Sequence, residues 1–139
     1  MSCEIISTPA DAAALIWTAL PKEQKEERVF VLPLDSHGKV LAKPILVSVG
    51  HEDGTAAIDA GTIFREALKA GAEEIIVAHN HPSGNLAPSK ADLAVTMELK
   101  ALSERLGVPL LDHLVIGAEE ANGFVSLAER KKIACPKRI

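Results

Sequence analysis

The stretch that decides the fold is EEIIVAHNHPSGNLAPSKADLAVTMELKALSERLG, residues 73–107. Residues 73–81 are a short run rich in β-branched side chains, which predicts a strand. Residues 89–107 repeat apolar side chains every three or four positions and end on glycine, which predicts a helix. A Pro-Ser-Gly turn separates the two segments. A strand followed directly by a long helix favours an α/β fold.

The flanking sequence continues this alternation of elements. We expect helices at 7–21 and 62–72 and strands at 109–117 and 123–129, while 28–49 should form two strands around a turn at 35–39. The expected order is α-β-β-α-β-α-β-β. It predicts a single three-layer α/β domain over residues 1–139, with a mixed sheet flanked by helices.

Local signals refine two of these elements. Thr8 and Asp11 have the Thr-x-x-Asp spacing of a capping box, which marks the start of the first helix. Pro33 lies in the first predicted strand but has no amide proton to donate to a neighbouring strand. We therefore expect Pro33 at a sheet edge or at a bulge.

Composition narrows the class of protein. The chain has 139 residues, of which 47% are hydrophobic and only 3% aromatic, and its formal net charge is −4. An acidic chain with few aromatic rings is not typical of a protein whose main partner is nucleic acid. The basic residues in 130–139 are expected to be a solvated tail, with an accessory contact to nucleic acid or to an acidic partner as the alternative. The oligomeric state is not indicated.

Cysteine use and hydropathy point to a reducing compartment. Cys3 and Cys135 are too few for a disulfide framework or a cysteine-based metal cage. The sequence shows no signal peptide and no apolar run long enough to cross a bilayer. We expect a cytoplasmic protein without membrane contact.

The most informative polar residues lie at the end of the strand 73–81. His79 and His81 share one face of that strand, so both imidazoles can bind one metal ion. Ser89 and Asp92 have the spacing of a capping box, and helix capping alone would explain them. A helix starting just beyond the strand would also bring Asp92 back towards the imidazoles. Two histidines and one carboxylate leave a position open for water, as in catalytic zinc sites.

Such a site needs one further group. Zinc lowers the pKa of a bound water and polarises a carbonyl oxygen. A carboxylate that is not itself a ligand must then take the proton of the water and deliver it to the leaving group. Local spacing does not identify this carboxylate.

The spacing His79-x-His81-Pro-x6-Ser89-x2-Asp92 matches the JAMM motif of the JAB/MPN metalloprotease superfamily. The segments HNHPSG…PSKAD and LLDHLVIG…FVSL resemble, more narrowly, the RadC branch, which is associated with DNA repair. The resemblance begins near Glu27 and covers nearly all of the chain that follows.

The resemblance implies a sheet of the cytidine-deaminase-like kind and a zinc ion (Zn2+) held by His79, His81 and Asp92. It implies a hydrolase that cleaves amide bonds, peptide or isopeptide, in a peptide or protein substrate. Ser89 would stabilise the oxyanion. Glu27 would be the general acid and base, with Glu26 as the rival position. Without the resemblance, both glutamates would be interpreted as part of an exposed charge run.

The chain departs from the RadC pattern in two places. It begins almost at the JAB domain, without the N-terminal helix-hairpin-helix region of longer members. In the loop 50–61, Asp59 and Ala60 stand where a His-Pro pair is usual. Two alternatives therefore stay open, a non-catalytic JAB scaffold and a nucleic-acid-binding domain of DNA repair. A zinc deaminase is excluded because the chain lacks H-x-E and P-C-x-x-C.

Three other histidines need an interpretation. His37 lies in a turn and is expected to be exposed, while His51 lies in the loop 50–61 and is a possible substrate contact. Asp112 and His113 are adjacent on a predicted strand. They could support a metal ligand, but a structural histidine paired with a neighbour is the favoured expectation.

Overall fold

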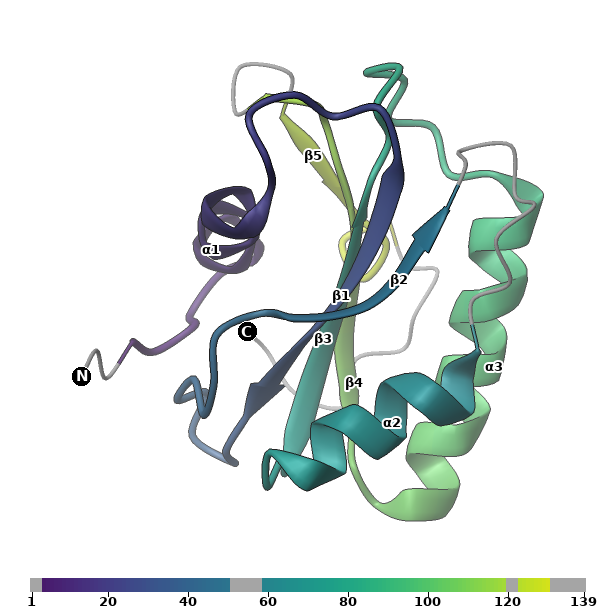
Figure 1. The fold of residues 1–139 in the computed structure, drawn as a ribbon. Coiled ribbons are helices and arrows are strands. Elements are labelled where there is room, and N and C mark those ends of the chain that lie inside the picture. The colour runs from purple at the N-terminus through teal and green to yellow at the C-terminus, as the bar shows by residue number, and fades with distance from the viewer. Residues whose placement is uncertain (1–3, 51–58, 120–122, 131–139) are drawn as a thin grey trace.

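The structure is a computed structural model, and it describes residues 4–50, 59–119 and 123–130. Its elements follow one another in the order predicted from the sequence (Figure 1). They are α1 (Pro9–Ala19), β1 (Glu27–Leu34), β2 (Ile45–Gly50), α2 (Ala60–Lys69), β3 (Glu74–Asn80), α3 (Lys90–Leu106), β4 (Leu110–Ile116) and β5 (Phe124–Ser126).

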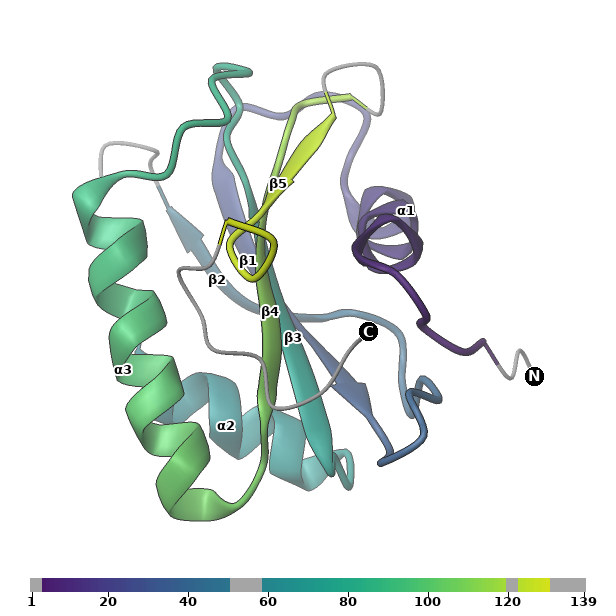
Figure 2. The same ribbon diagram turned by 180° about the vertical axis from the view of Figure 1, so that it is seen from behind.

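The strands form one mixed sheet in the order β2-β1-β3-β4-β5. Only β3 and β4 are parallel, and α3 makes the crossover that a parallel pair requires. Helix α1 covers one face of the sheet, while α2 and α3 cover the other (Figures 1 and 2). The predicted three-layer α/β architecture is therefore confirmed, and it is consistent with a JAB/MPN fold.

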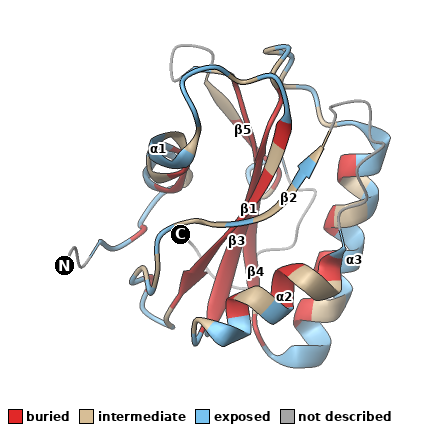
Figure 3. Ribbon diagram, viewed as in Figure 1, coloured by how far each residue is buried: buried red, intermediate tan, exposed pale blue. Residues whose placement is uncertain are grey.

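Each face of the sheet has its own apolar core. One core packs β1, β3 and β4 against α2 and α3, and the other packs the opposite faces of the same strands against α1. Every residue of β3 and β4 is buried, as the colouring of the central strands shows (Figure 3). Polar side chains on β3 are thus enclosed by protein, whichever face they point to.

The region 28–49 differs from the expectation. The second strand begins only at Ile45. Before it, Val40 forms an isolated bridge with Leu34 of β1. Pro33 does not lie at an edge, because it pairs with Ile75 of β3 and its carbonyl accepts from the Leu41 amide on the opposite side. The Leu41 amide donates to the Pro33 carbonyl at 2.9 Å, but Pro33 has no amide proton with which to return this bond. The register shift in that ladder lies between Val29 and Phe30, away from the proline.

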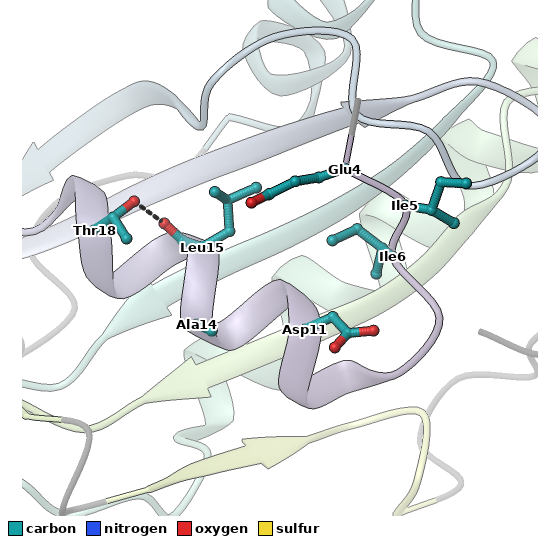
Figure 4. Close-up of a pocket in the computed structure, with 7 residues that line it drawn as sticks. All are labelled: Glu4, Ile5, Ile6, Asp11, Ala14, Leu15 and Thr18. Carbon is teal, nitrogen blue, oxygen red and sulfur yellow. Dashed lines mark hydrogen bonds between the residues drawn. The ribbon is translucent and has the colours of Figure 1, made fainter. Parts of the chain in front are cut away.

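A hollow of about 350 Å³ lies between α1 and the segment that precedes it (Figure 4). Its lining comes from residues 4–6 and from α1, so it opens on the α1 side of the sheet. It therefore does not belong to the face that carries α2 and α3. In the described part of the chain, no helix is both long enough and apolar enough to span a membrane.

We expect Gly107→Ala to lower the free energy of unfolding by about 1–2 kcal/mol, because Gly107 ends α3 in the left-handed conformation with φ of 69°. No atom would contact an added Cβ, so the cost would come from the backbone alone. Urea unfolding measures this difference. Gly107→Asn is the control and should be nearly neutral, because asparagine tolerates the left-handed region. Equal stability of wild type and Gly107→Ala would contradict this explanation of the helix end.

Candidate metal centre

The structure brings together the three residues that the sequence suggested as metal ligands. His79 lies on β3 with its side chain on the α2 and α3 face, and His81 follows directly after the strand. Asp92 lies in the first turn of α3. All three side chains are buried, and one possible ligand atom from each lies within 4.8 Å of the others.

The ring nitrogens and the carboxylate face one another. The Nε2 atoms of His79 and His81 are 3.1 Å apart. The Asp92 oxygens lie 3.1 Å from Nε2 of His79 and 3.2 Å from Nε2 of His81. Two nitrogens bound to one tetrahedral zinc ion at about 2.0–2.1 Å would lie roughly 3.3 Å apart. The arrangement therefore fits a common metal ion with little movement.

A chain of hydrogen bonds sets the tautomer of His79. The Thr96 hydroxyl donates to the Asp92 carbonyl at 2.8 Å, so its oxygen accepts from Nδ1 of His113 at 2.6 Å. Burial and the neighbouring His79 lower the pKa of His113 to about 3, so this imidazole is neutral. Its Nε2 must then accept from Nδ1 of His79 at 2.9 Å. This makes Nδ1 of His79 a donor and directs its Nε2 at the cluster.

The loop after β3 orients His81 in a similar way. Its Nδ1 donates to the Asn85 carbonyl at 2.6 Å, so Nε2 is the atom that faces Asp92. Burial lowers the pKa of His81, but the Asp92 carboxylate, the Asn85 carbonyl and the charge of Glu27 outweigh it and raise the pKa to about 8. Without a metal ion, His81 is therefore largely protonated at neutral pH.

Asp92 is both a capping residue and a member of the cluster. Its carboxylate accepts from the Ser89 amide at 2.8 Å, while the Ser89 hydroxyl accepts from the Asp92 amide at 3.0 Å. Burial raises the pKa of Asp92, but the hydrogen bonds from His79 and His81 lower it further, so the carboxylate stays ionised. The capping box and the ligand cluster are thus two uses of the same residues, and they do not exclude each other.

The two candidate glutamates lie in different surroundings. Glu27 is the first residue of β1, is only 8% exposed and acts electrostatically on His81. The side chain of Glu26 is 51% exposed, and its carboxylate lies 3.9 Å from the guanidinium of Arg28. Of the two, Glu27 is the one that lies near the cluster.

Sequence reasoning missed Thr96. The favoured expectation for His113 was a structural histidine paired with a neighbour, and its imidazole contacts Thr96 and His79. The Asp112 carboxylate contacts only the amide of His113 and otherwise binds the Ser126 hydroxyl and the Ala128 amide. The imidazole of His113 contacts His79, which fits the alternative of a support for a metal ligand. The sequence signal for this contact was His113 itself, which lies on the strand that follows the long helix.

The remaining sequence expectations divide into two groups. His37 is exposed, as expected, and Asp59 caps the start of α2 by accepting from the Gly61 amide. His51, Cys135 and the basic tail at 131–139 lie outside the described residues.

Comparison with known proteins places this arrangement in a family. The model of the RadC-like JAB domain matches residues 6–132. A UPF0758 protein of Clostridium perfringens is 38% identical over 125 residues, which cover 90% of this chain and 52% of the relative. A UPF0758 protein of Cyanothece sp. is 41% identical over 136 residues, which cover 96% of this chain and 53% of the relative. A UPF0758 protein of Carboxydothermus hydrogenoformans is 44% identical over 108 residues, covering 77% of this chain and 46% of the relative.

This chain therefore spans about half the length of the curated relatives it matches. The name that these relatives share states no activity, substrate or partner. The family model nevertheless covers both the described strands and the buried His-His-Asp cluster. The chain belongs to the family of RadC-like JAB domains.

Proposed function

We propose that this chain is a zinc-dependent hydrolase of amide bonds, peptide or isopeptide, in a peptide or protein substrate. One observation carries the proposal. Two imidazoles with their Nε2 atoms directed inwards meet an ionised carboxylate, and a buried glutamate lies beside them. This combination of a three-ligand cluster and a separate carboxylate suits hydrolysis by activated water.

The donor set fits zinc. His79, His81 and Asp92 would supply two nitrogens and one oxygen, and among the described residues the cluster contains no fourth protein ligand. Structural zinc sites are closed by four protein ligands, whereas catalytic sites keep one position for water or substrate. A closed structural role is therefore the less suitable use of this cluster.

The chain's own residues would divide the remaining chemistry. Zinc, when bound, supplies the Lewis acidity that polarises the scissile carbonyl and acidifies a water. The Glu27 carboxylate takes a proton from the attacking water and later delivers it to the leaving amine. Ser89 is exposed, and its hydroxyl accepts from the Asp92 amide, which leaves its own proton free to donate to the developing oxyanion.

The two alternative functions have less support. A non-catalytic scaffold has no need of a complete, buried ligand set with oriented tautomers. The basic tail that suggested a nucleic-acid-binding role lies outside the described residues. The substrate class and any association with DNA repair belong to the proposal.

The test of the proposed function combines metal content with turnover. Wild type should contain about one zinc per chain and cleave a peptide or isopeptide substrate. Glu27→Gln should keep the zinc but lose activity by about two orders of magnitude or more, because no carboxylate moves the proton. The matched control Glu26→Gln should keep both the zinc and the activity. The variant His81→Ala should lose the zinc. A fully active Glu27→Gln would refute the assigned base, and a wild type unable to bind zinc would refute the function.

His113→Ala should weaken zinc binding by about 10–100-fold, because His79 loses the partner that sets its tautomer. Competition with a chromophoric chelator measures the affinity. Thr96→Val keeps the volume of the side chain and should weaken binding less, in the same direction. His37→Ala, at an exposed histidine, is the control and should bind zinc like wild type. Wild-type affinity in a folded His113→Ala variant would contradict the role of this imidazole.

Zinc affinity should fall as the pH is lowered below about 8. The raised pKa of His81 means that a proton competes with the metal throughout the neutral range. The expected loss is about tenfold per pH unit below 8, with a plateau above it. Chelator competition from about pH 6 to about pH 9 measures the profile. If the affinity were constant down to pH 6.5, the usual value for histidine, the raised pKa would be wrong.

A further inference from the structure

Asn80 stands between the two histidines, and its side chain points to the opposite face of the sheet. Side chains alternate along β3, so Asn80 shares its face with Ile76 and Ala78, which belong to the core under α1. The Asn80 side chain is fully buried. A buried carboxamide is costly unless its donors and acceptor are satisfied, so its partners indicate what it does.

The carboxamide of Asn80 binds the two peptide groups on either side of Glu27. Its Oδ1 accepts from the Arg28 amide at 2.6 Å. Its Nδ2 donates to the Glu26 carbonyl at 3.2 Å and to the Gln24 side-chain oxygen at 2.9 Å. The Glu26 carbonyl belongs to the peptide before Glu27 and the Arg28 amide to the peptide after it. The backbone of Glu27 is thus held from both sides by one side chain.

This contact lies where regular pairing between β1 and β3 has ended. The ladder between these strands starts at Val29, which pairs with His79. Glu27 lies two residues beyond that point and pairs with Gly50 of β2. The Asn80 side chain takes the place of the missing ladder bonds. Gln24 extends the contact by donating to the Ala118 carbonyl after β4.

We propose that Asn80 is a positioning residue that fixes the Glu27 carboxylate relative to the metal ligands. The proposal rests on the proposed function in that Glu27 is taken as the general acid and base. Because Asn80 is covalently between His79 and His81, the strand that carries two ligands also carries the anchor of the base. A displacement of about 1 Å between reacting groups can lower a rate about 100-fold.

The role calls for asparagine. The two peptide groups need one acceptor and at least one donor from a single short, planar group, and a carboxamide supplies both. Aspartate would lack the donors, and an aliphatic side chain would leave the Glu26 carbonyl and the Arg28 amide without this partner.

The experiment compares Asn80→Ala with Ile76→Ala, a cavity variant on the same strand and the same face of the sheet. Asn80→Ala should lower kcat by about 10–100-fold with little change in KM. Its zinc affinity should stay within about twofold of wild type, because the ligands lie on the other face. Hydrogen exchange at the Arg28 amide should accelerate at least about tenfold in the metal-free protein. Ile76→Ala should lose stability without these effects on kcat or on the Arg28 amide.

A double variant separates positioning from general loss of structure. In the Glu27→Gln background, Asn80→Ala should cause no further loss of kcat, because the group it positions is already absent. An equal loss in both backgrounds, an unchanged kcat, or unchanged exchange at Arg28 would each overturn the proposal. If wild type cleaved no amide bond, the proposed function would fail. Hydrogen exchange at the Arg28 amide would then be the deciding measurement. Faster exchange in Asn80→Ala supports the contact of Asn80 with the backbone around Glu27, and an unchanged rate overturns it.

Discussion

The fold and the candidate site depend on the contact between the Asp92 carboxylate and the end of β3. This carboxylate accepts from the Ser89 amide and faces the Nε2 atoms of both His79 and His81. Through it, the first turn of α3 is attached to the strand that precedes the helix. The helix that begins at this point makes the crossover from β3 to β4 that a parallel pair requires. Asp92 thus belongs both to the candidate cluster and to the crossover helix.

Burial explains why the polar groups of the cluster are bonded to one another. β3 and β4 are covered on both faces, so each polar group on them needs a partner inside the protein. His113 accepts a hydrogen bond from His79 and donates one to the Thr96 hydroxyl. That hydroxyl in turn donates to the Asp92 carbonyl. The resulting chain of donors and acceptors makes Nδ1 of His79 a donor and directs its Nε2 into the cluster. An exposed cluster of the same residues would have water as a partner, and its tautomers would not be set.

Much of the arrangement follows from local pattern, and the rest depends on contacts between distant segments. Periodicity and capping gave the element order, and the spacing of His79, His81 and Asp92 gave the cluster. The position of β1 inside the sheet was mispredicted at Pro33, because the sequence does not show that the β1–β2 ladder stops at Val31. The contact between His79 and His113 joins residues 34 apart through parallel pairing, which periodicity does not encode. Glu26 and Glu27 could not be separated by spacing, whereas burial separates them.

The alternation of side chains along β3 has a consequence for evolution and design. One residue of slip in the register would move both imidazoles into the apolar core under α1 and turn Asn80 towards α3. The inward-facing imidazoles and the contacts of Asn80 with the peptides around Glu27 would be lost together. An insertion or deletion within this strand would therefore disrupt both features. The turn after His81 can change in length only as far as Asp92 still reaches the imidazoles.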